Sequence, residues 1–173
     1  MIAQDKRFYL DETGSCLNMT PLYGRSQKGQ RVYDKRPSSP GKRVNTLAIL
    51  SEEGIKVPYH FVGSLCADLF ITYLKTFVLP ILTDGQTIIM DNHPVHRAES
   101  VLKYLTKNSI KFLYLPPYSP DLNPIEEAFS KFKQYIKKKK ARTVDSLIMV
   151  MDDALKTITR SDSVGYFKHA NGF

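Results

Sequence analysis

The chain has 173 residues, of which 42% are hydrophobic and 24% are charged. This composition suits one globular domain with a buried core and excludes an intrinsically disordered chain. No apolar run approaches the roughly 20 residues that a membrane-spanning helix needs, and the charged start does not resemble a signal peptide. Cys16 and Cys66 fit no metal-ligand spacing, so we expect two reduced thiols in a cytoplasmic protein.

The formal net charge of +8 favours a polyanionic partner, most commonly nucleic acid. The positive charge gathers in two basic clusters. The first cluster, in a polar segment, contains Arg25, Lys28, Arg31, Lys35, Arg36, Lys42 and Arg43. The second cluster, near the end of a predicted helix, contains Lys131, Lys133 and the lysines at 137–140. A solvated surface is the ordinary explanation for each cluster, but we expect both to lie near the carboxylates described below, which favours contacts with phosphates.

Apolar alternation and short apolar runs predict strands at residues 7–11, 43–50, 55–62, 87–91 and 110–115. Apolar positions at helical spacing predict helices at residues 64–79, 96–108, 124–140 and 143–158. Residues 13–42 are polar and basic and predict a loop. The last two strands are expected to be buried, and Pro58 predicts an edge position or a bulge for its strand. An antiparallel start followed by alternating helices and strands predicts an α/β fold, with a mixed five-stranded sheet flanked by helices on both faces.

Three carboxylates are candidates for one site. Ligand sites in such sheets gather at the carboxyl ends of central strands, where Asp11 and Asp91 are predicted to stand. Glu126 lies in the first turn of the helix that follows a proline-rich stretch, and this stretch leads from a strand next to 87–91. Three converging carboxylates would have raised pKa values unless cations neutralise them. Mg²⁺ is the usual cation where phosphates are substrates.

A purely structural role for Glu126 is also open. Asn123 can be the N-cap of the helix and Pro124 its first residue, which makes Glu126 the third residue of a capping box. In that case Glu126 satisfies a backbone amide and has no part in chemistry.

Neighbouring polar residues have ordinary explanations. Glu12 is predicted on the sheet face opposite Asp11, and Glu127 is turned about 100° from Glu126 on the helix, so both are expected to be solvated or to support the ligands indirectly. His93 and His96 could pair as metal ligands, but no third histidine or cysteine accompanies them. We favour His96 as a residue that supports the site, and Asn92 as one that orients the turn after its strand.

Three segments together resemble a known family. "LDE" at 10–12, "DNHPVHRA" at 91–98 and "LPPYSPDLNPIEEAFSKFK" at 115–133 resemble the catalytic domain of mariner-like DDE transposases, and in particular their bacterial insertion-sequence relatives. The 34 residues between Asp91 and Glu126 are the interval typical of that group. Phe129 stands where many relatives carry Trp. The resemblance covers nearly the whole chain and implies an RNase H-like fold, with residues 1–173 forming a single catalytic domain.

The resemblance also implies a mechanism. Asp11, Asp91 and Glu126 would be the catalytic residues and would hold two Mg²⁺ ions, with Mn²⁺ as a substitute. The activity would be cleavage and strand transfer of DNA by in-line phosphodiester displacement. Hydrogen-bonding support for the ligands would come from Asn92, His96 and Asn123.

Double-stranded DNA, as transposon ends and target, would be the partner, and the active complex would be a homodimer. The basic residues expected to contact DNA are Arg25, Lys28, Arg31, Lys35, Arg36, Lys131, Lys133 and Lys137. The family's helix-turn-helix domain is expected to be absent from this chain. The chain could therefore be a fragment, a split reading frame or half of a frameshifted product, and a separately encoded N-terminal part is one possible source of that domain. The expected location is the bacterial cytoplasm at the nucleoid, with no membrane partner.

Two other functions compete with this one. The chain could be an inactive or repurposed fragment that binds DNA without sequence preference, although all three acidic positions are filled. It could also be an RNase H-like nuclease of another kind, which the 34-residue interval disfavours.

Overall fold

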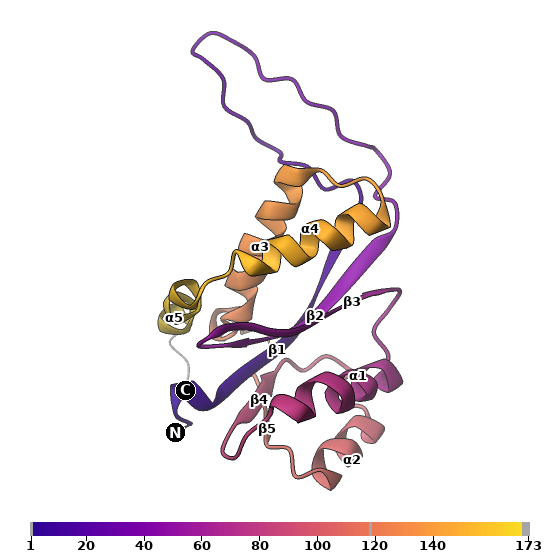
Figure 1. The fold of residues 1–173 in the computed structure, drawn as a ribbon, viewed down its shortest axis with the longest axis vertical. Helices are drawn as coiled ribbons and strands as arrows, with labels where there is room; N and C mark the ends of the chain where they lie inside the picture. The colour runs from indigo at the N-terminus through magenta and orange to yellow at the C-terminus, as the bar shows by residue number, and fades with distance from the viewer. Residues whose placement is uncertain (1, 118, 171–173) are drawn as a thin grey trace.

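Five strands form one sheet in the computed structural model of the chain, which describes residues 2–117 and 119–170 (Figure 1). Their order across the sheet is β3-β2-β1-β4-β5. Their bounds are β1 Arg7–Cys16, β2 Arg43–Ser51, β3 Gly54–Val62, β4 Thr87–Met90 and β5 Phe112–Tyr114. The first three strands pair antiparallel, whereas β4 is parallel to β1 and β5 is parallel to β4. The predicted mixed five-stranded sheet, with residues 7–11 beside 87–91, is confirmed.

Helices cover both faces of this sheet, as predicted. One face is covered by α1 (Ala67–Tyr73), which continues as a π-helix at Leu74–Val78 and a 3₁₀ turn at Leu79–Ile81, and by α2 (Glu99–Lys107). The other face is covered by α3 (Ile125–Lys139), α4 (Val144–Lys156) and α5 (Arg160–His169). Short 3₁₀ turns lie at Gln4–Lys6 and Pro120–Leu122. Within the described part of the chain, no helix is long and apolar enough to cross a membrane.

Side-chain alternation along β1 divides the core into two layers. Tyr9 packs into the layer under α3, α4 and α5, whereas its neighbours Phe8 and Leu10 pack into the layer under α1 and α2. Successive side chains of a strand point to opposite faces, so one central strand supplies both layers. β1 is therefore fixed from both sides, which makes it a rigid support for a site.

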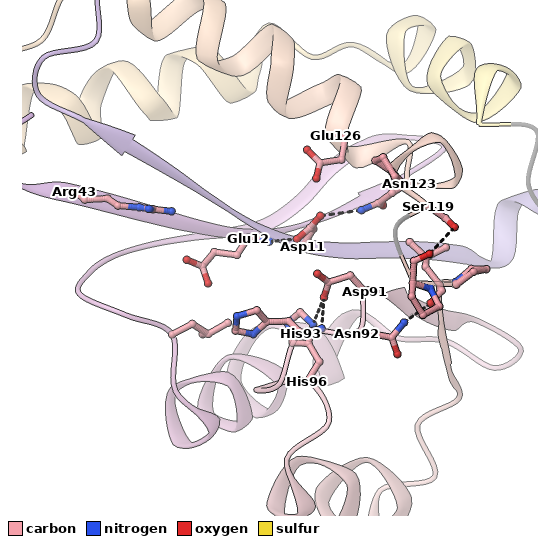
Figure 2. Close-up of a pocket in the computed structure, with 15 residues that line it drawn as sticks. Asp11, Glu12, Arg43, Asp91, Asn92, His93, His96, Ser119, Asn123 and Glu126 are labelled. Atoms are coloured by element: carbon pink, nitrogen blue, oxygen red, sulfur yellow. Dashed lines mark hydrogen bonds and ion pairs between the residues drawn. The ribbon is translucent and has the colours of Figure 1, made fainter.

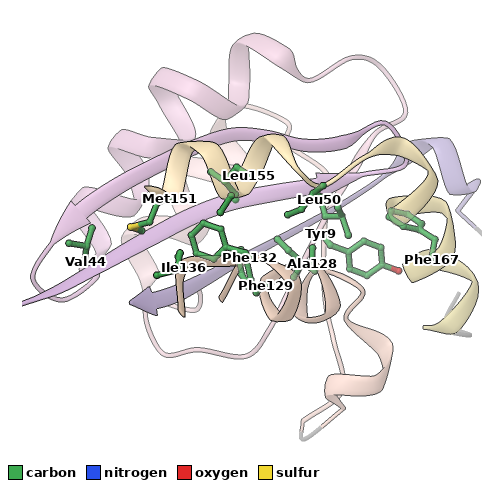
Figure 3. Close-up of a cluster of buried hydrophobic side chains, with 14 of the residues drawn as sticks. Tyr9, Val44, Leu50, Ala128, Phe129, Phe132, Ile136, Met151, Leu155 and Phe167 are labelled. Carbon is green, nitrogen blue, oxygen red and sulfur yellow. The ribbon is translucent and has the colours of Figure 1, made fainter. Parts of the chain in front are cut away.

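The position of α3 follows from its apolar stripe. Ala128, Phe129, Phe132 and Ile136 are fully or almost fully buried and pack with β2 residues such as Leu50 and with α4 (Figure 3). Phe129 is 1% exposed and anchors this stripe in the core. The stripe holds the first turn of α3 close to the middle of β1.

Several local predictions differ from the structure. β1 runs on to Cys16 instead of ending at residue 11, because residues up to Cys16 stay paired with β2. β5 is only half-buried because it is an edge strand. Helix α5 was not predicted, since its sequence has little helical periodicity; it begins with a capping box between Thr159 and Asp162.

The prediction for Pro58 is confirmed: β3 is the other edge strand, and its pairing with β2 shifts register between Leu47 and Ile49.

The segment between β1 and β2 projects from the body of the molecule beyond the C-terminal end of α3 (Figure 1). Arg142 holds its base, because the Nη1 atom donates hydrogen bonds to the carbonyl oxygens of Leu17 at 2.7 Å and Met19 at 3.0 Å. Asp34, in the part of the segment that returns toward β2, forms an ion pair with Lys140 at the C-terminal end of α3. The projection carries most of the first basic cluster away from the sheet.

Candidate active site

Asp11 and Asp91 lie side by side because of the register between β1 and β4. Leu10 and Met90 are the last parallel pair of these strands, and the two aspartates directly follow them. Asp91 thus stands at the carboxyl end of β4, as predicted. Asp11 was predicted at the end of its strand, and this is wrong: Asp11 lies in the middle of β1, at the point where the neighbouring strand β4 stops.

Glu126, in the first turn of α3, enters the same space from the other side. A hollow of about 660 Å³ is lined by all three carboxylate residues. Figure 2 shows Asp11 between Glu126, on the side of α3, and Asp91, on the side of β4. The remaining residues that line the hollow are Glu12, Arg43, Leu65, Asn92, His93, His96, Leu115, Pro116, Pro117, Ser119, Pro120 and Asn123.

The environment of Asp11 opposes its ionisation. Burial raises the pKa of this carboxyl to about 7, and the negative charges of Glu126 and Asp91 add to the rise. Two hydrogen bonds hold the side chain: the backbone N–H of Glu12 donates to Oδ1 at 2.7 Å, and Asn123 Nδ2 donates to Oδ2 at 2.8 Å. Asp11 is only 8% exposed. A carboxylate in this position is costly unless a cation accompanies it.

Asp91 has the opposite balance. Burial raises its pKa, but hydrogen bonds from His96 and from the backbone N–H of His93 outweigh burial and hold that pKa below its ordinary value. His96 Nδ1 lies 2.7 Å from Asp91 Oδ1, and the His93 N–H donates to the same oxygen at 3.0 Å. His96 is buried and packs against Phe70, with ring centroids 4.6 Å apart. Both contacts use Oδ1, so Oδ2 is available to a ligand in the hollow.

Asn123 does not cap α3, so the predicted capping box is wrong. The N-cap position of α3 is Pro124, without a side-chain cap, and the Glu126 backbone N–H donates to the Asn123 backbone oxygen at 3.1 Å. The Asn123 side chain bonds to Asp11 instead, because a carboxylate accepts a stronger hydrogen bond than a neutral group. Its Oδ1 is buried and has no partner among the described residues. The Glu126 side chain is exposed and, since α3 has no side-chain cap, it has no capping role.

Asn92 braces the turn after β4. Its Nδ2 donates to the carbonyl oxygen of Leu115, and its Oδ1 accepts from Arg97 Nη1 at 3.0 Å. Asn92, His96 and Asn123 thus all line the hollow, and the last two bond directly to the aspartates.

The structure adds to the prediction for Glu12, which lines the hollow. It does project from the opposite face to Asp11, but β4 ends at Met90, so both faces of β1 beyond this point border the hollow. Burial raises the pKa of Glu12, while the nearby charge of Arg43 lowers it. Glu127 instead pairs with His169 at 3.2 Å and does not line the hollow. Sequence reasoning missed Glu12 because strand alternation says nothing about where the neighbouring strand ends.

None of the eight residues predicted to contact DNA lines the hollow. Of the two basic clusters only Arg43, in the first, lines it, so the expectation that both clusters lie near the carboxylates holds for Arg43 alone. Arg25, Lys28, Arg31, Lys35 and Arg36 are exposed on the projecting segment. Lys137 is eleven residues along α3 from Glu126, roughly 16 Å at about 1.5 Å per residue. Lys131 is engaged by Asp162 at 2.7 Å, and Lys133 is half-buried.

The donor set fits hard divalent cations. Within residues 2–117 and 119–170, no three histidine, cysteine or acidic side chains already stand together as a metal-binding group. Mutual repulsion keeps carboxylates apart when no cation compensates them. Burial, and to a lesser degree the charges of Glu126 and Asp91, raise the pKa of Asp11, and carboxylate oxygens are the ligands that Mg²⁺ and Mn²⁺ prefer.

Comparisons with known proteins agree with this geometry. A family model described as DDE superfamily endonuclease matches residues 6–148. The Tc1 transposase of Caenorhabditis elegans is 27% identical over 94 residues, which are 54% of this chain and 34% of that protein. The chain therefore spans about a third of this curated relative.

Solved structures of the Mos1 transposase have the same fold. The pre-cleavage Mos1 transpososome superposes with a TM-score of 0.77 at 16% identity, over 96% of this chain and 52% of that chain. The mariner Mos1 paired end complex with Mg gives a TM-score of 0.75 at 16% identity, over 95% and 53%. The isolated Mos1 catalytic domain gives 0.65 at 14% identity, over 96% and 76%. The predicted RNase H-like fold is confirmed, and the chain belongs to the DDE superfamily endonuclease family.

Proposed function

We propose that this chain is the catalytic domain of a transposase, which cleaves and joins DNA strands by in-line phosphodiester displacement. The observation that carries the proposal is the meeting of Asp11, Asp91 and Glu126, from β1, the end of β4 and the start of α3, in one hollow of a basic chain. Structural carboxylates are normally paired with lysine or arginine, whereas among the described residues none of these three forms such a pair.

Asp11, Asp91 and Glu126 would hold two Mg²⁺ ions, with Mn²⁺ as a substitute. Bound divalent cations supply activation of the attacking oxygen and stabilisation of the leaving oxygen in a phosphodiester displacement. The Mos1 complexes that share this fold include ones with Mg and with Mn, which supports the choice of metal.

The chain's own residues prepare these ligands. His96 and the backbone of His93 hold Asp91 through one oxygen, which orients the other oxygen into the hollow. Asp11 is held through both oxygens, because the Glu12 backbone N–H donates to Oδ1 and Asn123 Nδ2 donates to Oδ2. Asp11 must lose its proton to act as a ligand, so metal binding should weaken as the pH falls below about 7.

The partner would be double-stranded DNA, as transposon ends and target, bound by a homodimer. The exposed basic residues of the projecting segment support phosphate contacts outside the hollow. We propose that residues 1–173 form the catalytic domain and that a separate N-terminal DNA-binding part recognises the specific end sequence. Location at a bacterial nucleoid stays a prediction.

A nicking assay tests the proposal and separates it from non-specific DNA binding without chemistry. Supercoiled plasmid is incubated with the chain and Mg²⁺, Mn²⁺ or Ca²⁺. We expect nicking with Mg²⁺ and Mn²⁺ but not with Ca²⁺, and loss of nicking in Asp91→Asn. Asp84→Asn, on an exposed turn, is the matched control and should nick like the wild type. Plasmid binding without nicking under every metal condition would show a DNA-binding fragment and overturn the enzymatic proposal.

A further inference from the structure

Arg43 lies at the border between the catalytic hollow and a second hollow. The second hollow, of about 550 Å³, is lined by Glu12, Lys42, Arg43, Asn45, Val62, Gly63, Ser64, Leu65 and His93. Four of these residues, Glu12, Arg43, Leu65 and His93, also line the catalytic hollow, so the two spaces are continuous. Arg43 is the only lysine or arginine among the residues that line the catalytic hollow.

The strand register places the Arg43 guanidinium across β1. Arg43 pairs with Cys16 and Asn45 pairs with Gly14, so these residues share one face of the sheet with Glu12. A Cβ atom built on Gly14 would lie 2.0 Å from Arg43 Nε and 2.4 Å from Cζ. Only glycine leaves room for the guanidinium here, which explains a glycine in the interior of a strand. Figure 2 shows the Arg43 side chain extending along the strands toward Glu12 and Asp11.

A short chain of hydrogen bonds holds the guanidinium in this place. Arg43 Nε donates to Asn45 Oδ1 at 2.8 Å, and Asn45 Nδ2 donates to the carbonyl oxygen of Gly63 at 2.6 Å. Asn45 is only 4% exposed, so this anchor is part of the folded core. An arginine whose only role was to be solvated at the surface would need neither the buried partner Asn45 nor the glycine at position 14.

The other two nitrogens of Arg43 are available. Among the described residues, neither Nη1 nor Nη2 donates a hydrogen bond, and Arg43 forms no ion pair with Glu12 or another carboxylate. A guanidinium is always charged, and its paired N–H groups match the geometry of two phosphate oxygens. Val62, 58% exposed, and the half-buried Leu65 add an apolar wall to the same hollow.

We propose that this second hollow is a subsite for the nucleotide next to the scissile phosphate, with its phosphate bound by Arg43 and its sugar and base against Val62 and Leu65. The proposal rests on the DNA-cleaving function above and names a substrate contact that the sequence placed only in a general basic cluster. Arg43 differs from the other basic residues because it alone reaches the hollow of the carboxylates.

The test measures DNA affinity in Ca²⁺, which permits binding without cleavage. A short fluorescent duplex with a single-stranded extension is titrated with the 173-residue chain at several salt concentrations. Arg43→Gln should bind roughly ten- to a hundredfold more weakly, because it loses a hydrogen-bonded contact between two charged groups. The slope of log affinity against log salt should fall by about 0.7 to 0.9, the value of one lost phosphate contact.

Gly14→Ala supplies an independent variant, because it displaces the guanidinium and keeps its charge. It should lower DNA affinity as Arg43→Gln does, and the double variant should bind no more weakly than Arg43→Gln alone, since both changes remove one contact. Arg160→Gln, on an exposed arginine paired with Glu53 far along the chain, is the matched control and should keep wild-type affinity. Circular dichroism melting and Mn²⁺ affinity without DNA should be unchanged in Arg43→Gln, which excludes misfolding and damage to the carboxylates.

The inference would be overturned if Arg43→Gln bound DNA with the same affinity and the same salt slope as the wild type. It would also be overturned if the losses of DNA affinity caused by Gly14→Ala and by Arg43→Gln were additive in the double variant. Metal-dependent nicking by the wild type together with either of these results would leave the proposed function standing. Arg43-dependent DNA binding by a chain that never nicks would support the subsite and overturn the catalytic proposal.

Discussion

Replacing Asp11 with Asn should make the protein more stable in the absence of metal while abolishing its activity. The pKa of Asp11 is raised from 3.8 to about 7, chiefly by burial and then by the charges of Glu126 and Asp91. Because the folded pKa lies above the unfolded value, the stability that the protonated carboxyl contributes is complete below pH 3.8 and is lost as the pH rises through about 7. At about 1.4 kcal/mol per unit, the raised pKa of Asp11 costs the folded protein about 4 kcal/mol at pH 8, where the folded carboxyl is ionised, and about 2 kcal/mol at pH 5, where folding must take up a proton.

Asn at position 11 removes this charge and keeps the shape. Its Oδ1 can still accept from the Glu12 backbone N–H, and rotation of the Asn123 amide would present the currently unpartnered Asn123 Oδ1 to the new Nδ2. We therefore expect Asp11→Asn to raise the free energy of unfolding by about 4 kcal/mol at pH 8 and by about half as much at pH 5.

Urea unfolding in EDTA at both pH values measures this difference, with Asp84→Asn as a control on an exposed turn. Mg²⁺ should stabilise the wild type at pH 8 and have little effect on Asp11→Asn, because the cation compensates the charge that the variant lacks. An Asp11→Asn protein that is less stable than the wild type at pH 8 in EDTA would refute the reasoning. A wild type whose metal-free stability rises from pH 5 to pH 8 would do the same.

Three further outcomes follow from the structure. Glu126→Gln should abolish metal-dependent nicking and change the free energy of unfolding by less than about 0.5 kcal/mol, because the exposed Glu126 side chain caps nothing; a large loss of stability in urea would contradict this. Phe129→Ala should lower the free energy of unfolding by about 3 to 5 kcal/mol through the cavity it leaves under α3, as measured by the same unfolding curves. Arg142→Ala should lower stability by about 2 kcal/mol and speed trypsin cleavage within residues 21–42, because the carbonyl oxygens of Leu17 and Met19 lose their donor; unchanged cleavage rates would argue against Arg142 as the anchor.

Local sequence patterns predict much of the fold. Within the residues that the structure describes, apolar alternation located all five strands and helical spacing located four of the five α-helices, because these periods depend only on neighbours along the chain. The family motifs around Asp91 and Glu126 singled out the carboxylates that the structure brings to one hollow. Helix α5 escaped because its ten residues carry little apolar periodicity, so only packing against the rest of the protein stabilises it.

The sequence by itself therefore determined the order of the elements, the two-faced sheet and the three acidic candidates. Tertiary structure alone decided which groups meet those acids. Asn123 bonds to Asp11 across 112 residues instead of capping its own helix, and Arg43 reaches the hollow because Gly14 lies opposite Asn45. Glu12 borders the site because β4 ends one residue before Asp91. These contacts depend on strand register, on where a neighbouring strand stops and on the strength of a distant acceptor, and none of these quantities has a local period in the sequence.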